Sequence, residues 1–231
     1  MENNYDFMNY AKGLGISSIQ LHYWGKLQDS LYQNVMVSNS LTPMILEERE
    51  MRVTLMSVFD RMMGERIIWA VGPVTDQMAT IIQAQLMYLD SISNNDITMH
   101  IDTPGGSCKS GLSMIDVMDY IKSDIITINT GMAASMGSVL LGAGTKGKRF
   151  SLPSSRVMLH QVSSGYEGNI QDMRISMNET EKINIELFNK LGSYCGKPAE
   201  EVIKDAERDK WLNSEEAVSY GIIDSVITKR I

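Results

Sequence analysis

The sequence contains little cysteine, which limits the disulfide, metal and redox chemistry open to the protein and indicates its cellular compartment. Among 231 residues there are two cysteines, Cys108 and Cys195, and they do not share a CxxC spacing. Two distant cysteines cannot build a disulfide framework, and they carry no metal or redox motif. We therefore expect a protein of the reducing cytoplasm.

Excess positive charge and long apolar runs are also missing. The formal net charge is −7, whereas binding to nucleic acid or to an anionic membrane depends on clustered Lys and Arg. The longest apolar runs, such as residues 67–71, are far shorter than the roughly 20 residues that span a bilayer. Glu2 and Asp6 stand where a secretion signal carries positive charge. We therefore expect no nucleic acid, no membrane and no conventional secretion signal.

The patterning of the chain changes near residue 41. Residues 1–40 are polar and show no sustained helical or strand period, which predicts an N-terminal extension. Hydrophobic residues make up 43% of the chain, enough to close one substantial core. We therefore expect a single folded domain over residues 41–231.

Short apolar runs alternate with helical periods in the first part of this domain. The predicted strands are 67–71, 97–101, 125–130 and 156–160. Helices are predicted between them: one that buries Met78, Ile81, Ile82, Leu86 and Leu89, one over about 110–122 and one over about 135–143. This alternation predicts an α/β fold with largely parallel strands.

Helical periods dominate the remainder of the chain. Apolar residues recur at three- and four-residue steps over about 171–191, which predicts a long helix. Pro198 favours the start of a short helix. Asn213 and Glu216 form a capping pair for another helix, which Gly221 ends. A last strand is expected over 222–227.

Ser135 lies in a segment of small residues, 131–138, between a predicted strand and a predicted helix. A hydroxyl placed there meets the free N–H groups and the dipole of a helix N-terminus, which favour a developing negative charge. The alternative is that Ser135 only caps the helix or permits close packing. As a nucleophile it would need a base, and the chain has three histidines, His22, His100 and His160. His160 ends a predicted strand, where functional groups of α/β sheets usually lie.

An acid partner for the histidine is not singled out by the pattern. Asp172, Asp205, Asp209 and Asp224 all lie downstream. The loop 102–107 contains two glycines that can bring bare backbone close to a ligand. It is a candidate oxyanion donor, a candidate anion site or a turn.

Four blocks of the sequence resemble one known family. The blocks are 103–106 (TPGG), 133–137 (AASMG), 143–150 (AGTKGKRF) and 155–161 (SRVMLHQ). In this order they are similar to the proteolytic subunits of Clp protease, and the similarity extends from about residue 41 to residue 229. The resemblance implies the ClpP/crotonase-like α/β fold of repeated β-β-α units with a protruding handle helix and strand.

The resemblance also implies the site residues of a serine endopeptidase. Ser135 and His160 are 25 residues apart, and His160 and Asp209 are 49 apart, as the family requires. The implied nucleophile is Ser135, the general base is His160 and the orienting acid is Asp209. The N–H groups of Gly106 and Met136 would form the oxyanion hole. No metal and no organic cofactor is implied.

The family resemblance implies an assembly and a partner. Its members form two stacked sevenfold rings around a chamber, and a Clp-type AAA+ unfoldase feeds them unfolded proteins. The helix over about 171–191 corresponds to the handle that joins the rings, and residues 1–40 stand where family propeptides are removed. Two alternatives remain: a structural ring subunit mixed with an active paralogue, and an acyl-CoA enzyme of the crotonase relatives.

The chain departs from the family pattern at three places. Residues 162–165 (VSSG) replace a proline and paired glycines on the expected substrate-binding strand, and 107–109 (SCK) is more polar than usual beside the cleft. Thr98 and His100 replace aromatic residues that line the docking cleft for the unfoldase. Cleavage preference and partner identity therefore do not transfer from the family.

Overall fold

The computed structural model describes residues 44–49 and 52–229, in two compact units that divide between Val58 and Phe59. In the first unit, β1 (Met44–Arg49) and β2 (Arg52–Ser57) pair as antiparallel strands. This hairpin was not predicted. The extension expected over residues 1–40 lies outside the described residues.

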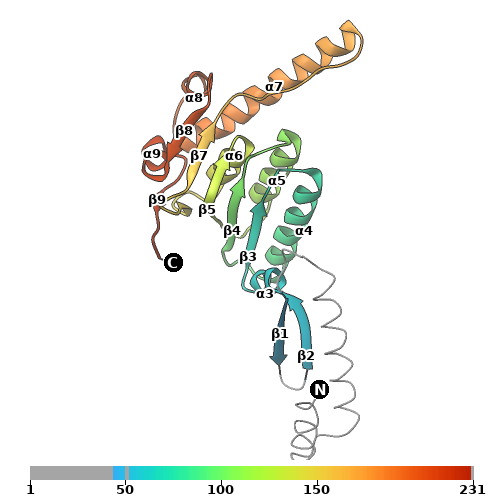
Figure 1. The fold of residues 1–231 in the computed structure, drawn as a ribbon, viewed down its shortest axis with the longest axis vertical. Coiled ribbons are helices and arrows are strands. Elements are labelled where there is room, and N and C mark those ends of the chain that lie inside the picture. Colours follow the sequence, from blue (N-terminus) through green and yellow to red (C-terminus); the bar gives the residue numbers. More distant parts are fainter. Residues whose placement is uncertain (1–43, 50–51, 230–231) are drawn as a thin grey trace, which may run out of the picture. The chain divides into compact units, whose positions relative to one another are not determined.

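The second unit is built around a seven-stranded sheet (Figure 1). Its main path runs in the order β3-β4-β5-β6-β9, and β7 pairs with both β5 and β8. All pairings are parallel except that between β7 and β8. The strands are β3 (Ile67–Val71), β4 (Ile97–Thr103), β5 (Ile125–Ala134), β6 (Arg149–Ser151), β7 (Arg156–Leu159), β8 (Lys210–Asn213) and β9 (Ser225–Val226). The predicted α/β fold with largely parallel strands is confirmed.

Helices follow most of the strands, as the alternating pattern predicts. They are α3 (Val58–Gly64), α4 (Asp76–Ile92), α5 (Cys108–Tyr120), α6 (Met136–Gly142), α7 (Ile170–Cys195), α8 (Ala199–Asp205) and α9 (Ser214–Tyr220). The capping box of Asn213 and Glu216 opens α9, and Gly221 ends it in the left-handed conformation at φ 96°. Within the described residues, no helix is both long enough and apolar enough to cross a membrane.

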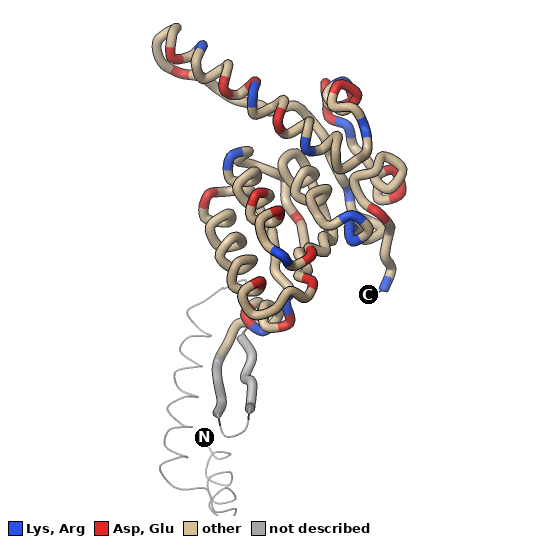
Figure 2. The backbone as a smooth tube through the Cα atoms, turned by 180° about the vertical axis from the view of Figure 1, so that it is seen from behind, with Lys and Arg blue, Asp and Glu red and all other residues tan. Residues whose placement is uncertain are grey.

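The longest helix, α7, extends away from the sheet (Figure 1). Acidic and basic residues are interspersed along it, as Figure 2 shows. Only its C-terminal half is anchored in the core, by Leu187, Phe188 and Leu191. The segment 160–168 before α7 contains no helix or strand. The resemblance implied a strand in this region, and the structure does not form one there. A strand would need a pairing partner, and the described part of this chain provides none.

Three short elements escaped prediction, and one strand is shorter than expected. β6 and β8 have three and four residues, too few to establish a strand period, and α3 has seven. The last strand covers residues 225–226 instead of 222–227 because Ile222 and Ile223 are buried in the core immediately after α9. In α4, Ile81 is exposed although the helical period placed it on the buried face.

The two faces of the sheet have different environments. Ile68, Met99 and Ile101 belong to the buried core, together with the apolar residues of α4. Because side chains alternate along a strand, the intervening residues point to the opposite face. There Trp69, Thr98 and His100 line an open cavity of about 600 Å³. This face of β3, β4 and β5 is the one on which the expected docking residues lie.

Candidate active site

Ser135 occupies a sharp turn between β5 and α6. Its backbone has φ 55° and ψ −123°, a conformation that is costly for a residue other than glycine. Two sets of hydrogen bonds hold it. The Ser135 N–H donates to the Met158 carbonyl at 2.8 Å, and the Ser135 carbonyl accepts from the N–H of Ser138 at 3.0 Å and from its hydroxyl at 2.6 Å. The turn directs the Ser135 hydroxyl away from α6, where it makes no capping hydrogen bond.

The glycine loop after β4 packs directly against this turn. A Cβ atom at Gly105 would lie 2.6 Å from Ser135 Cβ and 2.7 Å from the Ala134 carbonyl oxygen. Both Gly105 and Gly106 have positive φ, 89° and 149°. Glycine is therefore needed at position 105 for conformation and for space. The TPGG block brings bare backbone to within contact distance of the serine.

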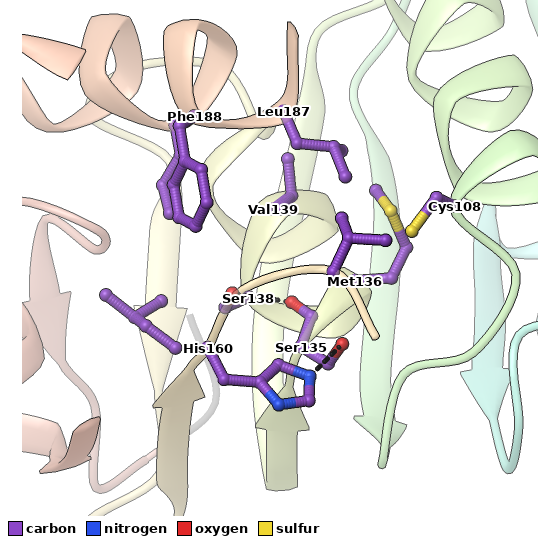
Figure 3. Close-up of a pocket in the computed structure, with 11 residues that line it drawn as sticks. Cys108, Ser135, Met136, Ser138, Val139, His160, Leu187 and Phe188 are labelled. Carbon is purple, nitrogen blue, oxygen red and sulfur yellow. Dashed lines mark hydrogen bonds between the residues drawn. The ribbon is translucent and has the colours of Figure 1, made fainter. Parts of the chain in front are cut away.

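His160 follows the last residue of β7 and faces the serine. The distance from His160 Nε2 to Ser135 Oγ is 2.8 Å, a hydrogen bond (Figure 3). The pairing of β7 with β5 sets this distance, because Met158 lies opposite Ala134. Ser135 comes one residue after Ala134 and His160 two residues after Met158, so both leave the same end of neighbouring strands.

Asp209 reaches the other side of the same imidazole. It precedes β8, and the antiparallel register pairs Leu159 with Lys210. His160, one residue after Leu159, therefore lies beside Asp209, one residue before Lys210. The distance from His160 Nδ1 to Asp209 Oδ1 is 3.6 Å, longer than a hydrogen bond. The Asp209 side chain is 64% exposed, against 29% for His160. The contact is a loose ion pair of the kind that often tightens only when substrate is bound.

The other three candidate acids have structural partners. At the start of α7, the Asp172 carboxylate accepts a hydrogen bond from the Asn169 side-chain amide, and the Asp172 N–H donates one to Asn169 Oδ1. Asp205 pairs with Lys210 at 2.9 Å, and the hydrogen bond from Lys210 holds the pKa of Asp205 below its usual value. Asp224 forms an ion pair with Arg149 at 2.6 Å. The geometry therefore favours Asp209 as the partner of His160.

Of the other two histidines, the structure describes one. His22 is outside the described residues. His100 stacks on Trp69, with 4.4 Å between ring centroids and an angle of 21° between the rings. It lies on the open face of the sheet, away from the Ser135 turn.

Gly106 and Met136 are the residues whose backbone N–H groups the family resemblance assigned to the oxyanion hole. Met136 is the first residue of α6, and the N–H of such a residue has no intrahelical acceptor. Val74, after β3, forms two backbone hydrogen bonds with the glycine loop. Its N–H donates to the Gly105 carbonyl and its carbonyl accepts from the Ser107 N–H, at 2.9 Å each. In a strand-like pairing, the N–H of the intervening Gly106 points to the opposite side.

An apolar pocket opens beside the serine hydroxyl (Figure 3). Its cavity is about 20 Å³, room for about one water molecule. Apolar side chains from α6 and α7 form most of its wall, with Ser135 and His160 on one side; they include Val139, Leu187 and Phe188.

The structure shows parts of this pocket that the sequence did not reveal. The helical period marked Leu187 as apolar, but it did not show that the residue faces Ser135. Cys108 also lines the wall, and burial raises the pKa of its thiol, so the group stays protonated. Its neighbour Lys109 is exposed.

A shallower groove of about 580 Å³ runs along the other side of His160. One wall is the segment 160–163, and the other is the segment 206–209. The Val162 N–H donates to Asn184 Oδ1 of α7 at 3.1 Å, which fixes the first wall. Among the described residues, no cluster of His, Cys, Asp or Glu is arranged to hold a metal ion.

A serine at a strand-to-helix turn, hydrogen-bonded to a histidine, is the arrangement of the serine hydrolases. Comparison with known sequences gives the family. The sequence model of the family described as "Clp protease" matches residues 48–230, and the chain therefore belongs to the Clp protease family. It is a serine-type peptidase.

Several curated relatives share nearly the full length of the chain. A protein of Porphyromonas gingivalis is 43% identical over 226 residues, which are 97% of this chain and 98% of the relative. A protein of Bacteroides fragilis is 44% identical over 227 residues, and one of Bacteroides thetaiotaomicron is 43% identical over 227 residues; each match covers 97% of this chain and 99% of the relative. All three are called "ATP-dependent Clp protease proteolytic subunit".

Proposed function

We propose that the chain is a serine endopeptidase in which Ser135 is the nucleophile, His160 the general base and Asp209 the orienting acid. The observation that carries the proposal is the hydrogen bond of 2.8 Å between Ser135 Oγ and His160 Nε2. The strained turn presents the hydroxyl to the imidazole instead of to the helix. A serine hydroxyl becomes an effective nucleophile when a base takes its proton.

The reaction follows from these positions. Ser135 Oγ bonds to the carbonyl carbon of the substrate as its proton passes to His160 Nε2. The imidazolium then gives this proton to the leaving amine, and the C–N bond breaks. Water, deprotonated by the same histidine, then bonds to the acyl carbon, the bond from that carbon to Ser135 Oγ breaks, and the histidine returns the proton to Oγ. Asp209 faces Nδ1, where a carboxylate keeps the Nδ1–H tautomer in place and stabilises the imidazolium.

The oxyanion of the tetrahedral intermediate needs donors that are already in place. The N–H groups of Gly106 and Met136 are the proposed donors: Gly106 adjoins Gly105, which packs on Ser135, and Met136 follows Ser135 at the start of α6. Losing one such donor typically costs about 2.7–4 kcal/mol of transition-state stabilisation. The strain at Ser135 and the two positive φ angles of the glycine loop are the structural cost of this arrangement.

The shape of the site indicates extended polypeptide as the substrate. The groove between segments 160–163 and 206–209 has open sides and leads to His160, so an extended chain can lie along it. We infer from the family that the sites face the chamber of two stacked sevenfold rings, in the cytoplasm. A Clp-type AAA+ unfoldase would deliver unfolded proteins to this chamber, and short peptides would enter unaided.

A Ser135→Ala variant tests the proposal. It should lose hydrolysis of a fluorogenic peptide and labelling by a serine-directed phosphonate, and it should assemble normally because one hydroxyl contributes little to packing. Full turnover in this variant would refute the assignment. An unmodified chain that binds no phosphonate and hydrolyses nothing would instead favour a structural ring subunit.

The same variant tests whether residues 1–40 are a propeptide. If the peptidase removes them, the active protein acquires a new N-terminus near Leu41 and Ser135→Ala retains the full-length chain. Intact mass spectrometry of both proteins decides the question. An active protein that keeps residues 1–40 would show that the extension is retained.

A further inference from the structure

The segment that carries Asp209 is a four-residue connection between two ordered elements. α8 ends at Asp205, and β8 begins at Lys210. At the β8 end, Lys210 pairs with Leu159, beside His160. Residues 206–209 therefore lie between a helix end and a strand start, and the exact position of Asp209 depends on how these two ends are held together.

Lys210 joins the two ends of this segment. Its Nζ lies 2.9 Å from Asp205 Oδ1, and the two side chains are about one third exposed, 32% and 28%. The ion pair thus links the last residue of α8 to the first residue of β8. It therefore connects the two residues that flank segment 206–209, which carries Asp209.

An aromatic ring fixes the Lys210 side chain from another direction. Lys210 Nζ lies 5.1 Å from the centroid of the Tyr220 ring, within cation–π range. Tyr220 belongs to α9 and is 8% exposed. Burial, and then the nearby Asp205 carboxylate, raise the pKa of its phenol, so the ring stays neutral beside the ammonium group.

Asp209 itself has little to hold it. In the described structure the polar partner of its carboxylate is His160, at 3.6 Å, and the side chain is 64% exposed. Such a weak contact cannot fix the segment that carries it. The backbone must place the carboxylate, and the contacts of Lys210 hold that backbone one residue away.

We propose that Lys210 is a positioning residue for the peptidase reaction, which acts by clamping the 206–209 segment so that Asp209 stays beside His160. The inference rests on the proposed roles of Ser135, His160 and Asp209. Lys210 touches neither the substrate nor the reacting atoms. Its effect passes through the position of the Asp209 carboxylate.

Lys197 provides a matched control. Its Nζ lies over the same Tyr220 ring, at 4.9 Å, and it forms an ion pair with Glu201 within the α8 region. Lys197→Met therefore removes the same charge from the same ring. It leaves the link between Asp205 and Lys210 intact.

The experiment compares Lys210→Met, Lys210→Arg and Lys197→Met in the full chain, with kcat and KM measured for a fluorogenic peptide. Misplacement by about 1 Å at a catalytic group can cost about 100-fold, so we expect kcat to fall in Lys210→Met by up to about 100-fold, and by no more than in Asp209→Asn, with KM nearly unchanged. Lys210→Arg, which keeps the charge, should recover most of kcat. Lys197→Met should match the unmodified protein. Asp205→Asn breaks the same ion pair from α8 and should reproduce the loss if Lys210→Met folds poorly.

A double-mutant comparison separates this inference from the proposed function. In an Asp209→Asn background, Lys210→Met should cause little further loss, because the carboxylate that it positions is already gone. An equal loss in both backgrounds, or unchanged kcat in both Lys210→Met and Asp205→Asn, would overturn the clamp. If Asp209→Asn alone had no effect, the assigned role of Asp209 would fail, and the clamp with it.

Discussion

Asp209→Asn tests the weakest contact of the proposed active site. The substitution keeps the size of the side chain but removes the negative charge that faces His160. During the reaction the imidazole carries a positive charge, so the carboxylate stabilises the transition state more than the ground state. The size of that stabilisation can be estimated from the distance of 3.6 Å between His160 Nδ1 and Asp209 Oδ1.

Two limits bracket the expected loss. Unit charges at 3.6 Å attract each other by about 1.2 kcal/mol at the dielectric constant of water and by about 4.6 kcal/mol at an effective value of 20. These energies correspond to about 7-fold and about 2,000-fold in rate. Because Asp209 is 64% exposed, the free chain favours the lower limit. Closure around substrate would move the loss toward the upper limit.

The assay is kcat for a fluorogenic peptide at the pH where the unmodified protein turns over fastest. Asp172→Asn is the matched control, since Asp172 lies in the first turn of α7, where Asn169 caps its N–H, and is not near the serine. We expect that control to keep its turnover. Equal rates for Asp209→Asn and the unmodified protein would refute the reasoning and would require another group to orient the imidazole.

Two further predictions concern positions that support the site. Gly105→Ala should reduce hydrolysis at least about 100-fold, because its Cβ would lie 2.6 Å from Ser135 Cβ; Gly147→Ala, also at positive φ but in open space, should retain turnover. Asp224→Asn should lower the free energy of unfolding by about 3 kcal/mol, since it leaves the buried Arg149 guanidinium unpaired. Burial raises the pKa of Asp224, but hydrogen bonds from Arg149 and Gly147 outweigh it and lower the pKa below the ordinary 3.8. The stability that Asp224 contributes is therefore present above pH 3.8 and lost as the pH falls below it, so urea unfolding of the two proteins should converge in acid.

The sequence predicted the order of the main strands and helices because their apolar periods are long enough to read. The pattern made Ser135 a candidate, in the small-residue segment before a predicted helix, and His160 a candidate at the end of a predicted strand; the family resemblance assigned their roles. Asp209 could be chosen only through the family spacing, since the pairing of Leu159 with Lys210 joins segments about 50 residues apart. Local pattern contains no information about that register.

Other contacts at the site were beyond sequence reasoning for the same reason. Leu187 and Phe188 were assigned to a helix, but their place in the pocket beside Ser135 depends on the angle at which α7 crosses α6. The stacking of Trp69 on His100 depends on the register of β3 with β4. Three-dimensional packing, not propensity, decides these contacts.

The open face of the sheet supports a last prediction, about the partner. Ile67, Trp69, Thr98 and His100 line one cavity of about 600 Å³, although parallel sheets are usually covered on both faces. We expect this cavity to receive an apolar loop of the unfoldase. Trp69 supplies aromatic surface there, while Thr98 and His100 supply small or polar surface where the family has aromatic residues.

Thr98→Tyr combined with His100→Tyr should therefore strengthen docking. Each added ring buries apolar area that Thr98 and His100 do not offer, and the gain is about 1–2 kcal/mol per contact at about 25 cal/mol per Å². A ring presents several such cavities, so avidity multiplies the gain. Thr80→Tyr, on the exposed side of α4, adds a ring outside the cavity and is the control. Interferometry with a Clp-type unfoldase should show weak docking to unmodified rings and to the control, and clearly tighter docking to the double variant. Tight docking to unmodified rings that the two substitutions leave unchanged would show that the unfoldase binds elsewhere.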